Sequence, residues 1–290
     1  MNKKSNNQKM TIYEVHNALF EILEEVDRIL TYNGIPYYLM FGTLLGCVRE
    51  GSPIKWDDDI DICVRAQDWD RMNALLMEHL DYDRFFLLNK NTKIDYPDGR
   101  FITRVGMNGT YRRMDYYKDS SNNSGIFIDI FILVDVSECT LAQKIWDYEL
   151  GVIDGIVNLH SFCKGSYSRP FFLSSLLYYL TRNKKDVVFW CELRRRIQNR
   201  FIDERTSHVT VPFGPFGVYP LKKTYYEAKD FLAVKKSPFS VKNAYGEVVK
   251  TGYFSIPIGY EGILKKTYGD WHKRPKGRRM PGVSFWEAKK

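Results

Sequence analysis

Helical periodicity marks the beginning of the chain. Thr11 and Glu14 form the capping box T-x-x-E, which is a common start of a helix. Apolar residues then recur three or four positions apart up to Leu30, which predicts an amphipathic helix with one buried face. Gly34 and Pro36 end this helix, because glycine favours the turn after a helix and proline cannot continue one.

Apolar runs separated by turns follow this helix and predict alternating strands and helices. The run YYLMF at 37–41 predicts a short buried strand, after which Gly42-Thr43 turns the chain into a short helix, LLGCVRE. A polar loop at 50–58 leads to a second strand, IDICV, at 60–64. Residues 66–80 then have the spacing of an amphipathic helix.

The rest of the chain changes character twice. Residues 85–134 are mostly β in pattern, and the apolar run GIFIDIFILVDV at 125–136 predicts a central strand. From 138 to about 205 the pattern is helical, with clustered basic residues. From 211 the chain is rich in Pro, Gly and aromatic residues, and a short helix is expected near its end.

The order of the predicted helices and strands indicates an α/β or α+β domain with a small mixed sheet. We expect three parts: a core at 10–136, a helical insertion at 137–210, and a C-terminal part at 211–290 that completes the domain and carries a basic tail.

Bulk composition narrows the class of protein. Apolar residues make up 44% of the 290 residues, which is enough for a sizeable core, so global disorder is not expected. A formal net charge of +8 favours an anionic partner without choosing among nucleotide, phosphorylated glycan, membrane surface and nucleic acid. The polar N-terminus lacks the apolar centre of a signal peptide. The apolar stretch PFFLSSLLYYL at 170–180 is shorter than the roughly 18 residues of a spanning helix. We therefore expect a cytoplasmic protein, with contact to the inner face of the membrane left open.

Cysteine and histidine spacing argues against a zinc site. The five cysteines include no C-x-x-C pair, and the five histidines show no H-E-x-x-H spacing. The odd number of cysteines also disfavours a disulfide framework and favours a reducing compartment. Any metal ion must therefore be held by carboxylates.

Four aspartates gather at the start of the strand predicted at 60–64: Asp57, Asp58, Asp59 and Asp61. Side chains of a strand alternate between its faces, so Asp59 and Asp61 are expected to project side by side while Ile60 faces the core. Adjacent carboxylates repel one another, and one keeps its proton unless a cation lies between them. Mg²⁺ or Mn²⁺ fits such a pair, because hard divalent ions prefer carboxylate oxygens.

A third candidate ligand, Asp129, lies inside the apolar run at 125–136. Burying an unpaired carboxylate there costs on the order of several kcal/mol. A metal ion, an arginine partner or an active-site cavity would remove that cost. Two interpretations stay open: Asp59, Asp61 and Asp129 together hold two metal ions, or residues 57–59 form a solvated turn and Asp129 pairs with an arginine.

Gly42 and Thr43 are candidates for a phosphate cradle. Glycine lets the backbone approach a ligand closely, and the start of a helix offers free N–H groups and partial positive charge. Thr43 either binds a phosphate oxygen or caps the helix. Arg49 either reaches the same anion or is a surface arginine, and Trp56 either stacks on a base or sugar or fills the core. A phosphate cradle beside a metal pair suits phosphoryl transfer, in which positioning and charge neutralisation dominate.

The stretch FGTLLGCVREG…IKWDDDIDICV resembles the signature of the LicD family, which includes bacterial phosphocholine transferases and the fukutin-related proteins. The typical signature has proline where this chain has Lys55. GIFIDIFILVD resembles the family's second block and FSIPIGYEGILKKTYGDW its closing block, so the resemblance covers most of the chain except 138–210. The signature residues that match are Gly42, Thr43, Leu44, Leu45, Gly46, Arg49, Trp56, Asp57, Asp58, Asp59, Ile60 and Asp61.

This resemblance implies a nucleotidyltransferase fold of the polymerase-β type, with the catalytic core at 10–136. It also implies a CDP-activated donor such as CDP-choline. Asp59 and Asp61 would ligate Mg²⁺ or Mn²⁺. Asp129 would ligate the second metal ion and accept the proton of the acceptor hydroxyl, and Gly42 and Thr43 would cradle the donor phosphates. The expected reaction transfers a phospho-alcohol, phosphocholine above all, to a hydroxyl of a cell-surface glycan such as capsule, teichoic acid or lipopolysaccharide.

Other functions and contacts stay open. A nucleotidyltransferase would use the same carboxylates to move NMP to a small alcohol. A non-enzymatic anion-binding or nucleic-acid-binding protein is compatible with the pI near 9.0, but we find no nucleic-acid motif and expect no nucleic-acid partner. PFFLSSLLYYL with the adjacent TRNKK either contacts a membrane that carries a lipid-linked glycan acceptor or packs within the fold. Four basic residues of the tail either neutralise donor charge or form a solvated face: Lys273, Arg274, Arg278 and Arg279.

Overall fold

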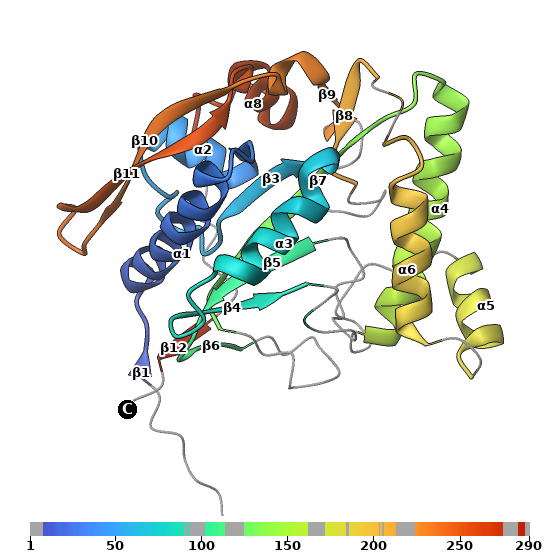
Figure 1. Ribbon diagram of the computed structural model, residues 1–290, viewed down its shortest axis with the longest axis horizontal. Coiled ribbons are helices and arrows are strands. Elements are labelled where there is room, and N and C mark those ends of the chain that lie inside the picture. Colours follow the sequence, from blue (N-terminus) through green and yellow to red (C-terminus); the bar gives the residue numbers. More distant parts are fainter. Residues whose placement is uncertain are drawn as a thin grey trace, which may run out of the picture.

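The computed structural model describes residues 8–89, 92, 102–113, 125–161, 172–183, 186–202, 204, 206–212, 224–274 and 284–287 (Figure 1). The helices are α1 (Ile12–Tyr32), α2 (Phe41–Glu50), α3 (Trp69–His79), α4 (Thr140–Ser161), α5 (Phe172–Thr181), α6 (Val187–Gln198) and α8 (Tyr260–Tyr268), with 3₁₀ helices η1 (Ala66–Asp68) and η3 (Ala228–Phe231). The strands are β1 (Gln8–Lys9), β2 (Tyr37–Leu39), β3 (Asp61–Arg65), β4 (Phe85–Leu88), β5 (Ile102–Met107), β6 (Thr110–Arg113), β7 (Phe127–Asp135), β8 (His208–Thr210), β9 (Tyr226–Glu227), β10 (Val234–Lys242), β11 (Val248–Pro257) and β12 (Ser284–Glu287).

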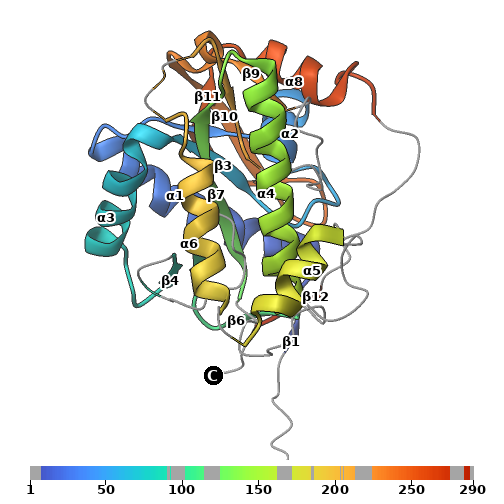
Figure 2. The ribbon, with the colours of Figure 1, turned by 90° about the vertical axis from the view of Figure 1, so that its right-hand side faces the viewer.

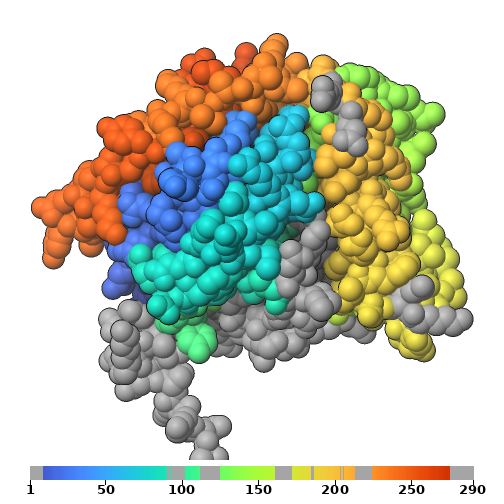
Figure 3. All heavy atoms as spheres, viewed as in Figure 1, coloured from blue at the N-terminus to red at the C-terminus, as the bar shows by residue number. Residues whose placement is uncertain are grey.

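Helix α1 confirms the predicted capping box. The Thr11 hydroxyl accepts from the Glu14 N–H, and the Glu14 carboxylate accepts from the Thr11 N–H at 2.7 Å. The apolar stripe of α1 packs against β5 and β7, so α1 and its neighbour α3 cover one face of the central sheet (Figures 1 and 3).

The central sheet is mixed, as the sequence predicts. Its strand order is β2-β3-β7-β5-β4, and β8 and β9 extend it from the end of β7. β3 and β7 run parallel, while β2 pairs with β3, β5 with β7, and β4 with β5 in antiparallel orientation. β7 is almost wholly buried and central, which confirms the prediction from its apolar run.

The turn between β2 and α2 differs from the prediction. The strand expected at 37–41 ends at Leu39, and α2 begins at Phe41, so Gly42 and Thr43 lie inside the first helical turn. Phe41 adopts a positive φ of 49°, and its ring packs edge-on against Phe131 with 5.8 Å between ring centroids. Met40 and Phe41 are apolar and so continue the sequence pattern of the strand. In the structure the backbone turns after Leu39, and both side chains are buried in the core.

Among the described residues of the stretch that the sequence predicts as helical, three helices are formed. α4, α5 and α6 lie beside the sheet (Figure 2) and share a second, smaller apolar cluster. That cluster contains Val152, Ile153, Ile156, Val157 and Trp190. The division of the chain into three parts stays a prediction. Within the described part of the chain, none of the helices combines the length and the apolarity needed to cross a membrane.

The C-terminal part combines one confirmed and one unexpected element. The predicted short helix is α8, which follows directly after β11. The two-stranded antiparallel hairpin β10–β11 was not predicted, and it projects at the upper left of Figure 1. The alternation of exposed and buried side chains along β10 is weak, because exposed residues lie on both faces of this strand.

Candidate active site

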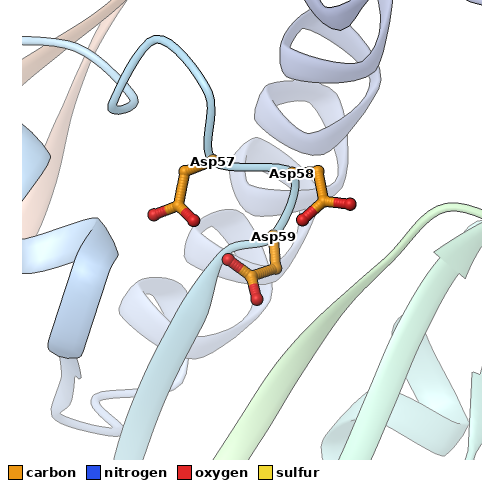
Figure 4. A group of neighbouring side chains, drawn as sticks. All are labelled: Asp57, Asp58 and Asp59. Atoms are coloured by element: carbon orange, nitrogen blue, oxygen red, sulfur yellow. The ribbon is translucent and has the colours of Figure 1, made fainter. Parts of the chain in front are cut away.

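Three consecutive carboxylates gather in the turn before β3. Oxygen atoms of Asp57, Asp58 and Asp59 all lie within 4.8 Å of one another. The three residues are half-buried, and the Asp57 N–H donates to the Ile54 carbonyl at 2.8 Å, which fixes the turn. Figure 4 shows the carboxylates of Asp57 and Asp59 on one side of the turn and that of Asp58 on the other. The local chain path thus brings like charges together.

The crowding of these carboxylates changes the protonation of Asp57. Burial, followed by the negative charges of Asp59 and Asp58, raises the pKa of Asp57 to about 8. A shift of this direction is the expected result when adjacent carboxylates lack a compensating cation. The donor set is all oxygen, as Mg²⁺ and Mn²⁺ prefer, so the residues present fit a divalent ion.

Asp61 and Asp129 meet across neighbouring strands. They are register partners in the parallel pair β3–β7, and the Asp129 N–H donates to the Ile60 carbonyl at 2.9 Å. Paired residues of adjacent strands point to the same face, and the strands lie about 4.8 Å apart. The β-ladder therefore brings together two aspartates that are far apart in the sequence.

Asp59 does not occupy the predicted position in a strand. β3 begins at Asp61, so the alternation that was expected to set Asp59 and Asp61 side by side does not apply. Asp59 lies in the acidic turn with Asp57, while Asp61 pairs with Asp129. The physical reason is that the ladder with β7 starts at the Ile60 carbonyl, and the chain before it turns away.

Asp129 has an arginine partner, as one of the two interpretations predicted. The Arg104 Nε donates to Asp129 Oδ1 at 2.5 Å, and the two residues are register partners in β5 and β7. The Arg104 guanidinium also lies over the Phe127 ring, 4.3 Å from its centroid. Arg104 is only 8% exposed, so this is a buried ion pair that compensates the charge of Asp129. The signal in the sequence is a lone arginine within an apolar strand.

Gly42 lets the acidic turn approach the start of α2. A Cβ atom at this position would lie 2.5 Å from Asp57 Oδ2, so a larger residue would displace the carboxylate. The partial positive charge at the N-terminus of a helix favours a nearby carboxylate. The role of Gly42 in binding phosphate stays a prediction.

Thr43 ties α2 to β3. Its Oγ1 accepts from the Asp61 N–H at 2.9 Å, and the residue is 3% exposed. The alternative that Thr43 caps the helix is wrong, because the N-cap is Met40 and no side chain caps this end. Thr43 therefore positions the backbone of Asp61, and phosphate binding by its hydroxyl stays a prediction.

Arg49 joins α2 to the C-terminal part. Its side chain is 9% exposed and donates to Glu50 Oε1 at 2.9 Å and to the Trp271 carbonyl at 3.3 Å. The alternative of a surface arginine is therefore wrong, and contact with a donor phosphate stays a prediction. Arg274 also pairs with Glu50.

Trp56 and the remaining basic residues of the C-terminal tail complete the set of predicted site residues. Trp56 is half-buried and packs against the main core, which confirms the core alternative, while stacking on a base or sugar stays a prediction. Lys273 is exposed and pairs with Asp270 at 2.6 Å, which agrees with the alternative of a solvated face. Arg278 and Arg279 lie outside the described residues.

His16 is a site residue that the sequence interpretation missed. It lies on α1, is 5% exposed, and its Nε2 lies 2.6 Å from the Asp57 carbonyl oxygen. Burial lowers the pKa of His16, although the bond to Asp57 and the charge of Asp58 oppose that shift. A carbonyl only accepts, so Nε2 carries the proton and donates. The signal in the sequence is a histidine inside the apolar stripe of a helix.

Comparison with known proteins covers this same region. Residues 34–153 match the family model described as LicD/FKTN/FKRP, nucleotidyltransferase domain. These residues form a LicD-family domain. It includes the predicted site residues between Gly42 and Asp129, the paired strands β3 and β7 and the first part of α4, but not the basic residues of the tail. The family description favours a transferase-type role. The closing block at the C-terminus lies outside the matched range.

Two curated relatives share only part of their length with this chain. An uncharacterized protein of Rickettsia prowazekii is 31% identical over 84 residues, which are 27% of this chain and 32% of that protein. An uncharacterized protein of Rickettsia typhi is 39% identical over 51 residues, which are 18% of this chain and 16% of that protein. The chain therefore matches about a third of the length of one relative and about a sixth of the other.

Proposed function

We propose that the chain transfers a phospho-alcohol, phosphocholine above all, from a CDP-activated donor to a hydroxyl of a cell-surface glycan in a metal-dependent reaction. The observation that carries this proposal is the pairing of Asp61 with Asp129 across parallel strands, directly after the acidic turn. A nucleotidyltransferase fold of the polymerase-β type is part of the proposal. The mixed sheet and the family description support it.

Carboxylates from two chain segments would hold the metal ion. In this proposal Asp59, Asp61 and Asp129 are the ligands of Mg²⁺ or Mn²⁺. Burial together with the crowded negative charge of Asp59 and Asp58 raises the pKa of Asp57, and this crowding of carboxylates supports a cation site here. When bound, divalent ions supply neutralisation of donor phosphate charge and of charge on the attacking and leaving oxygens.

The chain's own residues have distinct tasks in this reaction. Arg104 fixes the carboxylate of Asp129, whose oxygens accept the proton of the acceptor hydroxyl. Thr43 fixes the backbone of Asp61. In this proposal a donor phosphate meets the start of α2, where the helix presents backbone N–H groups and partial positive charge beside the acidic turn.

The proposal is tested by ³¹P NMR with Mg²⁺. The chain is incubated with CDP-choline, CDP-ethanolamine, CDP-glycerol and CDP-ribitol, each with teichoic acid, lipopolysaccharide or capsule as acceptor. We expect CMP release from one donor, and at least about a hundredfold loss in Asp61→Asn and Asp129→Asn, since both groups act in the transition state. Asp135→Asn is the matched control, because Asp135 is also on β7 and also pairs with an arginine, Arg65, at 3.1 Å. Wild-type rates in both site variants, or no consumption of any CDP-alcohol, would contradict the proposal.

A second candidate is transfer of NMP to a small alcohol. The description of the matching family as a nucleotidyltransferase domain favours it. The same carboxylates would serve, with attack at the α phosphorus of a nucleotide. Mass spectrometry of the acceptor separates the two reactions, because the acceptor gains either a phospho-alcohol or a nucleotide. A non-enzymatic role would be favoured if calorimetry detected no Mg²⁺ binding with or without CDP-choline.

A further inference from the structure

Helix α5 has an unusual outer face. Its ten residues, FLSSLLYYLT, include no charged side chain. Four large side chains point outward, with exposed fractions of 84% for Phe172, 43% for Leu176, 60% for Tyr179 and 66% for Leu180. The outer face of a surface helix normally carries charged and polar residues, so this face is typical of a helix that is covered by something else.

The inner face of α5 is already occupied. Ser174 is fully buried, and its hydroxyl donates to the Val152 carbonyl of α4 at 2.9 Å. Leu173 and Leu177 pack against the second apolar cluster. The orientation of α5 is therefore fixed, and its outer side chains cannot turn inward without breaking these contacts. The helix lies at the periphery, beside one end of α4 (Figures 2 and 3).

The sequence on either side of α5 is basic. Between residues 161 and 185 the sequence has five lysines and arginines and no acidic residue. Arg182 is exposed at the end of α5, and its guanidinium lies over the Tyr179 ring, 5.2 Å from the centroid. An apolar helix face with an exposed arginine at its end, in a basic stretch of the sequence, complements a lipid surface with anionic headgroups.

We propose that the outer face of α5 docks on an anionic membrane surface. Phe172, Leu176 and Leu180 enter the boundary between headgroups and acyl chains. Tyr179 and Arg182 remain at headgroup level, where an aromatic ring with a polar tip and a long basic side chain are both stable. This contact goes beyond the transfer reaction and does not depend on it, because it uses none of the residues of the acidic site.

Co-sedimentation of the full chain with vesicles tests the proposal. The vesicles contain phosphatidylcholine alone or an equal mixture with phosphatidylglycerol. We expect binding to the anionic vesicles only, at least about tenfold weaker binding for Phe172→Ser/Leu180→Ser, and binding a few-fold weaker for Arg182→Gln. Leu232→Ser/Tyr245→Ser is the matched control, because these side chains are 82% and 91% exposed on other elements, and it should bind like the wild type.

Two results would overturn the proposal. One is that the wild type does not sediment with anionic vesicles. The other is that Phe172→Ser/Leu180→Ser sediments with the vesicles as the wild type does. If light scattering then showed that the wild type is a dimer and this variant a monomer, the face would be an interface between two copies. Both substituted side chains are exposed, so thermal melting should show an unchanged fold. Because no donor is used, failure here is distinct from failure of the proposed reaction.

Discussion

Proton release on binding of the proposed metal ion is an expected consequence of the acidic turn. Burial and the charges of Asp59 and Asp58 raise the pKa of Asp57 to about 8. At pH 7, one unit below that value, about nine-tenths of the Asp57 groups carry a proton in the metal-free protein, and at pH 9 about one-tenth do. A divalent ion favours the ionised form, so its binding should release about 0.9 proton at pH 7 and about 0.1 at pH 9.

Calorimetry in buffers of different ionisation enthalpy measures this release. The observed enthalpy of Mn²⁺ binding is plotted against the buffer enthalpy, and the slope gives the number of protons. Asp57→Asn should bind Mn²⁺ with almost no release at pH 7. The reasoning would be refuted if wild-type binding released no proton at pH 7, or if Asp57→Asn released as many.

The same shift sets a pH dependence of stability. The pKa of Asp57 is raised in the folded state, so this group's stabilising contribution is full below about pH 4 and is lost as the pH rises to about 8. Since each pKa unit corresponds to about 1.4 kcal/mol, the metal-free protein should lose on the order of several kcal/mol of unfolding free energy across this range. Saturating Mn²⁺ should flatten the curve.

Three further substitutions test other parts of the account. His16→Ala removes the donor to the Asp57 carbonyl, so it should lower the unfolding free energy by about 1–3 kcal/mol and weaken Mn²⁺ binding. His16→Gln, whose amide can donate, should recover part of both losses. Equal losses in the two variants would contradict a hydrogen-bonding role. Gly42→Ala should weaken Mn²⁺ binding, because its Cβ displaces the Asp57 carboxylate and so disturbs the acidic turn that holds the proposed ligand Asp59. Gly262→Ala, whose Cβ meets its nearest atom at 3.4 Å, should not weaken it, and unchanged affinity in Gly42→Ala would count against the contact. Burial raises the pKa of Asp147 to about 6, although the hydrogen bond from Tyr225 opposes this shift. The stability of the wild type should therefore fall as the pH rises from about 4 to about 6, and Asp147→Asn should melt at a higher temperature than the wild type at pH 7 but not at pH 4. Equal melting temperatures of the two proteins at pH 7 would contradict the shift.

Local patterns were sufficient for the elements that depend on local interactions. The capping box of α1 is formed within one turn, so Thr11 and Glu14 predict it directly. β7 is recognisable because a central strand needs apolar side chains on both faces. The aspartates were recognisable as a group because four of them stand so close together in the sequence.

Tertiary contacts decide what the sequence could not. The start of β3 is set by its ladder with β7, and the strand begins at Asp61, one residue later than predicted, so the strand alternation does not extend to Asp59. Arg104 reaches Asp129 only because β5 pairs with β7 in one particular register. His16 lies about 40 residues before Asp57 in the sequence, and only the packing of α1 over the acidic turn brings the two together.

Mn²⁺ binding followed by electron paramagnetic resonance tests most directly whether aspartates from two strands form one cation site. Wild type, Asp61→Asn, Asp129→Asn and the control Asp135→Asn are titrated under the same conditions. We predict at least about tenfold weaker binding in Asp61→Asn and in Asp129→Asn, because each would lose a carboxylate ligand, and wild-type binding in the control. Wild-type affinity in both Asp61→Asn and Asp129→Asn would contradict a shared site.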